Sequence, residues 1–214
     1  TLHTADETNL SSYLDNGGAL LFSSQDYLYD KHGDGGNIAS GSFARDYLNV
    51  IAFSGDQSIT RNQGITCDPI SGGMDLIMDY PSGLTNYSDT IAVDSDAIEL
   101  FETTGGTPTA VRYPINYADD TRHVIFLPFP FEAVPSNTDP NNRSYLMGAM
   151  VDWLLNGTGS GPNTAPSSFN LLAPTNGVNT VPLTITFDWE NSTDPNTPCD
   201  SVHYTLFYST YPGC

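Results

Sequence analysis

The chain has 214 residues, with 25 Asp and Glu against 6 Lys and Arg, and a formal net charge of -19 at pH 7. Nucleic-acid binding needs a cationic surface that displaces counterions from phosphates, so this charge argues against it. The 6 basic residues form no cluster, which argues against docking on anionic lipid. No apolar run approaches the roughly 18 residues that a membrane span needs, so we expect no membrane insertion.

The composition favours an extracellular or cell-surface protein. The chain has a single Lys and is rich in Asn, Thr, Ser, Gly and Tyr. It also contains five N-x-S/T sequons, which are glycosylation candidates if the protein passes a glycosylating secretory route. We expect the last two to be the most accessible, and chance occurrence is the alternative interpretation. The sequon asparagines are Asn9, Asn86, Asn142, Asn156 and Asn191.

Three cysteines, Cys67, Cys199 and Cys214, leave at least one unpaired within the chain. Cys199 and Cys214 flank a strand-like run whose ends lie roughly 20 Å apart or more, at about 3.3 Å per residue. A disulfide tolerates Cα separations of about 7 Å at most, so these two pair only if the chain folds straight back. Otherwise Cys214 bonds something beyond the chain or stays free. We interpret Cys67 as a structural or buried thiol, not a nucleophile.

The first elements in chain order are a helix and a strand. Thr4 and Glu7 frame a capping box, apolar residues follow at helical spacing, and two glycines stop the pattern, which predicts a helix from about Ala5 to Asp15. The continuous apolar run Ala19–Ser23 then predicts a strand covered on both faces, as in a parallel sheet.

Further helices and strands alternate up to residue 156. Ser42–Asn49 predicts a short helix, and Asp139-Pro140 predicts the start of another with Pro at its first position. Its apolar continuation, Tyr145–Leu155, should be buried against the sheet. The predicted strands are Met74–Tyr80, Ile98–Thr103, Thr109–Ile115 and His123–Leu127. This alternation predicts a layered α/β domain over residues 1–156.

The pattern changes after a linker. Residues 157–166 are rich in Gly, Ser and Pro without apolar periodicity, which is typical of a linker. Residues 167–214 then alternate apolar and polar side chains between Pro, Asn, Asp and Gly turns, which predicts a partial all-β sandwich segment. Its strand-like runs are Phe169–Pro174, Leu183–Trp189 and Val202–Tyr208.

Two families are suggested by these residues. The stretches Leu14–Asp26, Phe43–Leu48, Cys67–Ser71 and His123–Glu132 resemble the class I glutamine amidotransferase-like domains of secreted microbial proteins, over about residues 1–156. This resemblance implies a flavodoxin/amidotransferase-like layered fold. The segment Phe169–Tyr208, with Phe187-Asp-Trp189 and Ser192-Thr-Asp-Pro195, resembles the first strands of a fibronectin type III-like module.

The residues that would make such a domain an enzyme are not found. Active members of the amidotransferase family place a Cys on a strand-to-helix turn and a His-Pro-Glu motif after a late strand. Here the turn reads Phe22-Ser-Ser-Gln-Asp26, and the late strand leads to Glu132 without the His. A nucleophile needs an adjacent base, so we predict no catalytic residue. Ser24, with Asp26 and His32 following, suggests a hydrolase, but no G-x-S-x-G frames it and we interpret it as a helix N-cap.

Two acidic stretches are candidates for Ca²⁺, a cation that takes six to eight oxygen ligands. Neither has EF-hand spacing, and a solvated turn is the alternative interpretation. The candidate ligands are Asp30, Asp34, Asp188, Asp194 and Asp200. We expect no other cofactor, and we assign no metal role to the isolated histidines His3, His123 and His203.

The functional expectation is a non-catalytic extracellular structural or interaction module that self-assembles, for instance into a filament, or belongs to a larger cell-surface protein. Three strand-like runs cannot bury the aromatic faces of Phe187, Trp189, Tyr204 and Phe207 by themselves. We therefore expect neighbouring copies, or the remainder of the same precursor, to complete the β layers. The alternatives are a substrate- or polysaccharide-binding region of a secreted hydrolase or peptidase, and a small-molecule binder at the strand carboxyl ends.

Overall fold

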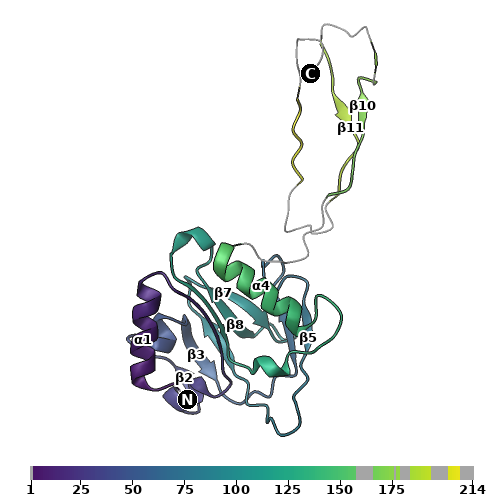
Figure 1. Ribbon diagram of the computed structural model, residues 1–214. Helices are drawn as coiled ribbons and strands as arrows, with labels where there is room; N and C mark the ends of the chain where they lie inside the picture. Colours follow the sequence, from purple (N-terminus) through teal and green to yellow (C-terminus); the bar gives the residue numbers. More distant parts are fainter. Residues whose placement is uncertain (1, 158–165, 176, 179–183, 194–201, 208–214) are drawn as a thin grey trace. The chain divides into compact units, whose positions relative to one another are not determined.

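The computed structural model describes residues 2–157, 166–175, 177–178, 184–193 and 202–207 (Figure 1). The chain divides into two compact units, Thr1–Pro162 and Asn163–Cys214, called unit 1 and unit 2 below. This division falls inside the stretch 157–166 that we expected to be a linker, most of which lies outside the described residues.

Unit 1 contains four α-helices, two 3₁₀ turns and nine strands among its described residues. The helical elements are α1 (Thr4–Asp15), α2 (Tyr27–His32), α3 (Phe43–Asp46), η1 (Tyr117–Asp119), η2 (Phe131–Ala133) and α4 (Arg143–Asn156). The strands are β1 (Ala19–Ser23), β2 (Gly35–Asn37), β3 (Val50–Ser54), β4 (Arg61–Gly64), β5 (Asp75–Ile77), β6 (Thr90–Val93), β7 (Ile98–Glu102), β8 (Pro108–Tyr113) and β9 (His123–Leu127).

The strands form a six-stranded sheet in the order β1-β9-β8-β7-β4-β5 and a three-stranded sheet in the order β2-β3-β6. Among the described pairs only β1 and β9 run parallel, with Ala19 opposite His123 and Ser23 opposite Leu127. The predicted strands at these positions are confirmed with the same bounds. Strand β1 does pair in parallel, but it is a half-buried edge strand and the other described pairs of its sheet are antiparallel, so the parallel sheet expected around it is wrong. The α/β class is confirmed as well, as a curled sheet of mixed direction.

Side-chain alternation along the central strands divides the core between the two faces of the large sheet. Ile125 and Leu127 belong to a buried cluster with Trp153 and other residues of α4. Val124 and Phe126 point to the opposite face, into a second cluster with side chains of α1, α2, α3, β3 and β6. Helix α4 therefore covers one face of the sheet (Figure 1), and the three-stranded sheet with the other helices covers the second.

Helix starts differ from the prediction at two places. The N-cap of α1 is His3, whose backbone N–H donates to Asp6 Oδ2 at 2.8 Å, so the predicted capping box from Thr4 to Glu7 is wrong by one residue. Helix α4 begins at Arg143, and Pro140 is not its first residue. Asn142 is the N-cap of α4. Its side-chain oxygen accepts the N–H of Tyr145 at 2.8 Å, which satisfies a backbone amide of the first turn that has no partner within the helix.

Other predicted elements are present but shorter. The helix expected over Ser42–Asn49 is α3, which Ser42 caps and which ends at Asp46. The strands expected at Met74–Tyr80, Ile98–Thr103 and Thr109–Ile115 correspond to β5, β7 and β8. Strands β2, β3, β4 and β6 were not predicted from the sequence, and a helix after β1 was implied only by the interpretation of Ser24 as an N-cap.

Unit 2 contains two short antiparallel strands among its described residues, β10 (Leu171–Ala173) and β11 (Asp188–Trp189). They lie within the runs Phe169–Pro174 and Leu183–Trp189 but are shorter than predicted. The described residues 202–207 of the third run are assigned to no strand. An aromatic group nevertheless forms: the Tyr204 ring lies 5.0 Å from Phe169 and 5.4 Å from Trp189 between centroids.

Candidate functional site

The carboxyl ends of β1 and β9 lie side by side because these two strands are parallel neighbours. The backbone N–H of Ser24, just after β1, donates to the carbonyl of Leu127 at 3.0 Å. The Ser23 hydroxyl donates to the Phe129 carbonyl at 2.8 Å and accepts the Phe131 N–H at 3.0 Å. The structure thus joins the two loops that the family resemblance singled out, and the Ser23 hydroxyl is used in holding them together.

The turn after β1 does not place Ser24 as expected. Helix α2 begins at Tyr27 and its N-cap is Asp26, so the interpretation of Ser24 as a helix N-cap is wrong. The chain makes an additional turn through Gln25 and Asp26, and the side-chain oxygen of Gln25 accepts the N–H of Tyr87 at 3.2 Å. Asp26 makes no side-chain capping hydrogen bond.

Glu132 lies in η2, in the loop that follows β9. Its side chain is exposed, and its main-chain carbonyl accepts a hydrogen bond from Arg143 at 2.5 Å. Glu132, which the resemblance matched to the Glu of the His-Pro-Glu motif, thus lies on the surface, and its carbonyl is hydrogen-bonded to the first residue of α4.

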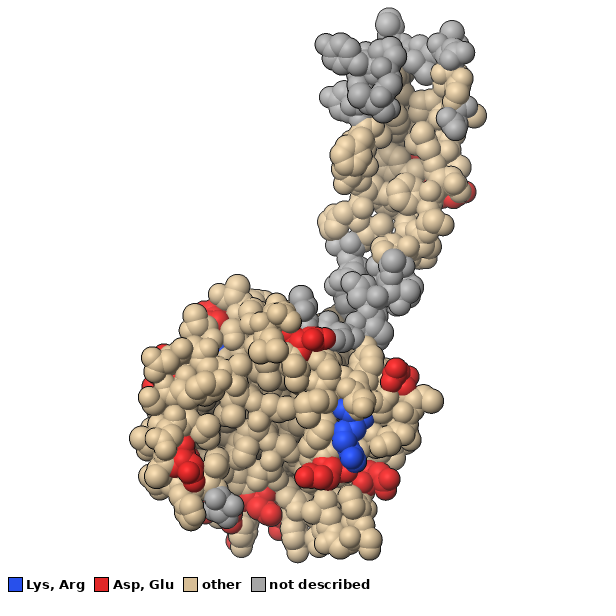
Figure 2. Space-filling model, viewed as in Figure 1, with Lys and Arg blue, Asp and Glu red and all other residues tan. Residues whose placement is uncertain are grey.

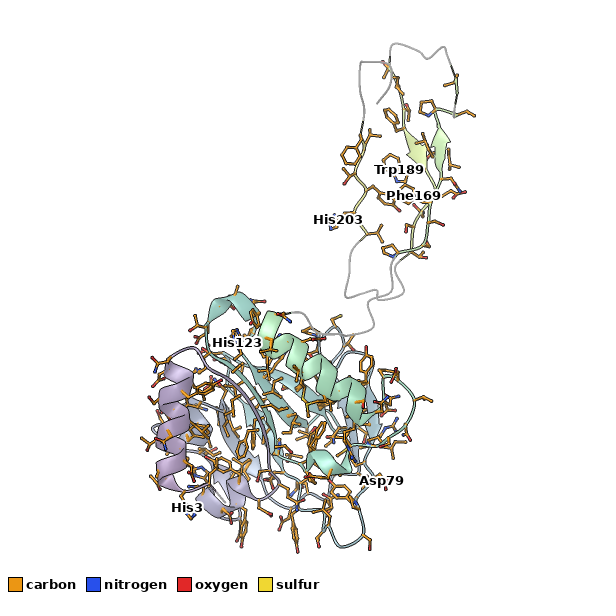
Figure 3. The ribbon with its side chains drawn as sticks, in the orientation of Figure 1. His3, Asp79, His123, Phe169, Trp189 and His203 are labelled. Atoms are coloured by element: carbon orange, nitrogen blue, oxygen red, sulfur yellow. The ribbon has the colours of Figure 1, made fainter. Side chains whose placement is uncertain are left out.

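The histidines lie in other surroundings. His32 ends α2 with its ring 6.4 Å from that of Phe53, and burial lowers its pKa. His123 is buried and stacks on Tyr117 at 3.8 Å between centroids, with Nε2 3.0 Å from the Tyr117 carbonyl. His203 lies on the surface of unit 2 (Figure 3). Within the described part of the chain, no hydrogen bond joins a histidine to Ser23 or Ser24.

A carboxylate that the sequence analysis missed lies at the same edge. Asp89 immediately precedes β6, its backbone N–H donates to the Pro128 carbonyl at 3.0 Å, and its Oδ1 accepts the Asp56 N–H at 3.1 Å. Asp89 is 0 % exposed, and its Oδ2 has no hydrogen-bond partner. The only sequence signal is that Asp89 and Thr90 precede the short apolar run Ile91–Val93, and this pattern by itself does not predict burial of the Asp.

The charges around Asp89 are acidic. The pKa of Asp89 is raised to about 7, chiefly by burial and in addition by the carboxylates of Asp56 and Asp26, although the hydrogen bond from Asp56 N–H lowers it. Burial and the charges of Asp30 and Asp56 also raise the pKa of Asp26. We call Asp26, Asp56 and Asp89 the Asp89 cluster. Figure 2 shows that Asp and Glu side chains are spread over the visible face of unit 1, with few Lys and Arg among them.

The predicted Ca²⁺ ligands are scattered. Asp30 lies in α2, Asp34 is exposed just before β2, and Asp188 is exposed in β11, whereas Asp194 and Asp200 lie outside the described residues. Over the described ranges, no group of three or more His, Cys, Asp or Glu side chains is assembled to hold a metal ion.

The loop that contains Cys67 is fixed by buried polar contacts. Cys67 is exposed and disulfide-bonded, so of the structural or buried thiol that we expected, the buried thiol is wrong, whereas a disulfide is compatible with a structural role. Cys199 and Cys214 lie outside the described residues. Next to Cys67, Asp68 Oδ2 accepts Arg112 Nε at 2.6 Å, and both side chains are buried. The Arg112 guanidinium also lies 5.1 Å from the ring centroid of Trp153. A sulfur held in a disulfide offers no thiolate for nucleophilic attack.

The five sequon asparagines differ in exposure. Asn9, Asn156 and Asn191 are exposed. Asn142 is only 8 % exposed and caps α4, while the side-chain nitrogen of half-buried Asn86 donates to the Ile59 carbonyl at 2.9 Å. The first three are therefore the accessible candidates.

Helices of the described residues are all too short or too polar to cross a membrane. Comparisons of the chain with protein-family models, with curated proteins and with solved structures found no match.

Proposed function

We propose that the chain is a non-catalytic extracellular structural module, in which unit 1 is an amidotransferase-like α/β domain and unit 2 is part of a fibronectin type III-like sandwich. One observation carries the proposal: no described residue of unit 2 is a buried hydrophobic residue, although many of its side chains are large and apolar. The exposed ones are Phe169, Leu171, Leu172, Val178, Ile185, Leu206 and Phe207.

These side chains need a facing layer. Phe207 is 90 % exposed, and burying one Leu or Phe side chain contributes about 1.5–3 kcal/mol. Two short strands are marginal in water, whereas three or more with a covered apolar face are stable. Added strands would supply both the missing main-chain hydrogen bonds and the missing apolar cover.

The strands that complete unit 2 come from a neighbouring copy or from the remainder of the same precursor. Head-to-tail repetition of such a contact builds a filament. A net charge of -19 opposes the approach of two copies, so assembly should strengthen as salt screens the repulsion.

Three features support the absence of catalysis. Ser24, the candidate nucleophile, does not lie on a direct strand-to-helix turn, because α2 begins at Tyr27 with Asp26 as its N-cap. Cys67 is held in a disulfide. The loop after β9 keeps an exposed Glu132 without the His of the active family members.

The test is the molar mass of the full chain by light scattering at micromolar concentrations and two salt concentrations. We expect the mass to rise above that of the monomer with concentration and salt. The double variant Leu206→Ser, Phe207→Ser should stay monomeric, whereas Ile77→Ser, a change at a 62 % exposed apolar residue of unit 1, should assemble like the wild type. A monomeric wild type whose unit 2 resists protease would contradict completion by other strands.

A second candidate function is polysaccharide binding within a secreted hydrolase. The aromatic group of unit 2 favours it, because a hollow of about 520 Å³ lined by Ser167, Phe169 and Ser192 adjoins these rings. Phe169 and Trp189 both lie on the side of the segment 202–207 (Figure 3). Electrophoresis through gels that contain soluble polysaccharides decides it: retardation that Trp189→Ala abolishes would support this function.

A further inference from the structure

The buried carboxylate of Asp89 has one oxygen, Oδ2, that makes no hydrogen bond. The residue is 0 % exposed, and Oδ1 accepts the Asp56 N–H while Oδ2 has no partner. A buried polar atom without a partner costs free energy, and an ionised one costs more. Such an atom points to a missing partner: a proton, a water molecule or a cation.

A second oxygen lies close to this carboxylate. A Cβ built on Gly55 would lie 3.3 Å from the main-chain carbonyl oxygen of Asp34 and 3.8 Å from Asp89 Oδ1. The Asp34 carbonyl oxygen and Asp89 Oδ1, the neighbour of the unpartnered Oδ2 in the same carboxylate, therefore both lie near the position that a side chain at Gly55 would occupy. The loop before β2, which the sequence suggested as a Ca²⁺ candidate, thus contributes a backbone oxygen next to Asp89.

The charged groups that act on Asp89 itself are carboxylates, and the N-terminal amino group acts only on Asp26. Asp56 and Asp26 act on Asp89, and Asp30 acts on Asp26. Asp26 and Asp56 are exposed, and Asp26 makes no capping hydrogen bond. The ion pairs of the described residues place Lys and Arg elsewhere, such as Lys31 on Glu7 and Arg45 on Asp94.

We propose that the Asp89 cluster, together with the Asp34 carbonyl, binds a hard divalent cation, Ca²⁺. Calcium takes carboxylate, carbonyl and water oxygens in flexible geometry, which matches this donor set. The three carboxylates are not assembled around a common point as they stand, so the exposed side chains of Asp26 and Asp56 turn toward Asp89 when the ion binds. The ion supplies the partner that Asp89 Oδ2 lacks.

A specific site differs from general counterion attraction. A chain with a net charge of -19 attracts cations over its whole surface, and that attraction changes little when one carboxylate is removed. Binding at the proposed site depends on Asp89 in particular. Asp89→Asn keeps the shape of the side chain and removes a buried charge, so we expect the variant to fold.

The experiment is a calorimetric titration of the chelator-treated full chain with CaCl₂ at pH 8, with thermal unfolding in CaCl₂ and in NaCl of equal ionic strength. We expect wild-type affinity on the order of 10⁻⁴–10⁻³ M, as in extracellular calcium modules. Asp89→Asn and the exposed Asp56→Asn should each weaken binding by about tenfold or more. Asp96→Asn, an exposed change of equal charge in the β6–β7 turn, should bind like the wild type.

Two results overturn the proposal. Equal calcium affinity in the wild type and in Asp89→Asn would mean that calcium binds elsewhere, for example in unit 2. Equal stabilisation of the wild type by CaCl₂ and NaCl would mean that a proton or a water molecule satisfies Asp89. Asp56→Asn keeps the test decisive should Asp89→Asn fail to fold.

Discussion

Two segments that were predicted as strands differ in burial between the two units. In unit 1, all five residues of β9, His123–Leu127, are buried between α4 and the three-stranded sheet. In unit 2, the segment Val202–Phe207, in which apolar and polar residues alternate, ends in a Phe that is 90 % exposed. The comparison shows that the apolar side chains of such a segment become buried only where a second layer of structure packs against them. Unit 1 contains that layer, and we propose that unit 2 obtains it from outside.

The largest expected effect tests the difference in burial between the two units by truncating one large side chain in each. Trp153, 1 % exposed, contacts Tyr117, His123 and Arg112, so Trp153→Ala should cost unit 1 about 3–5 kcal/mol. Phe207→Ala should change the unfolding free energy of the monomer by less than about 0.5 kcal/mol. Urea unfolding followed by circular dichroism measures both. Similar losses would show that Phe207 is packed within the monomer.

A second prediction concerns the buried ion pair of unit 1. Arg112→Met leaves Asp68 buried with only its backbone and Ser71 partners, and the loss should be about 3–5 kcal/mol. The control is Arg61→Met, which breaks the exposed pair between Arg61 and Asp75. Exposed pairs contribute little, so this control should unfold at the wild-type temperature. If both variants lose the same stability, burial does not distinguish the two pairs.

The next effect is smaller and depends on pH. Because the pKa of Asp89 is raised to about 7, folded protein holds this proton more tightly than unfolded protein, and its contribution to stability falls as pH rises from about 4 to about 7. Asp89→Asn removes this loss. In chelator, the variant should match the wild type near pH 4 and be more stable by about 1–3 kcal/mol at pH 8. Thermal unfolding across this range checks it, and a difference that does not change with pH would contradict it.

The smallest effect is expected at the sequons, where glycans change the surface and leave the core intact. Expression in a glycosylating secretory host should modify the exposed Asn9, Asn156 and Asn191. Asn142 and Asn86 should stay unmodified because their side-chain nitrogens already donate hydrogen bonds. Peptide mapping by mass spectrometry measures occupancy, and glycans on Asn142 would show that the cap of α4 opens.

The parts of the fold that the sequence predicted are those with strong local signals. The runs that became β1 and β9 are continuously apolar, and their bounds agree with the structure. Strand β4, Arg61–Gly64, has no such pattern, because its inward residue is the buried Asn62. The start of α4 was misplaced because a Pro and a capping Asn compete as helix signals within three residues, and the hydrogen bond of Asn142 decides the outcome.

The candidate site was less predictable. The resemblance pointed to the turn after β1 and the loop after β9, which the structure brings together through Ser23 and Ser24. Asp89 could not be found, because its burial depends on Pro128 and Asp56, which lie far from it in the sequence. Similarly, the disulfide of Cys67 could not be predicted, because it depends on tertiary structure.

Amide hydrogen exchange of the full chain, from submicromolar to about 100 μM, tests the central claim most directly. We predict that unit 1 is protected at every concentration, while the amides of residues 167–207 gain protection as concentration and salt rise. Protection should be lost in Leu206→Ser, Phe207→Ser and retained in Ile77→Ser. Full protection of unit 2 in a monomer at the lowest concentration would contradict the claim that strands from outside complete its β layer.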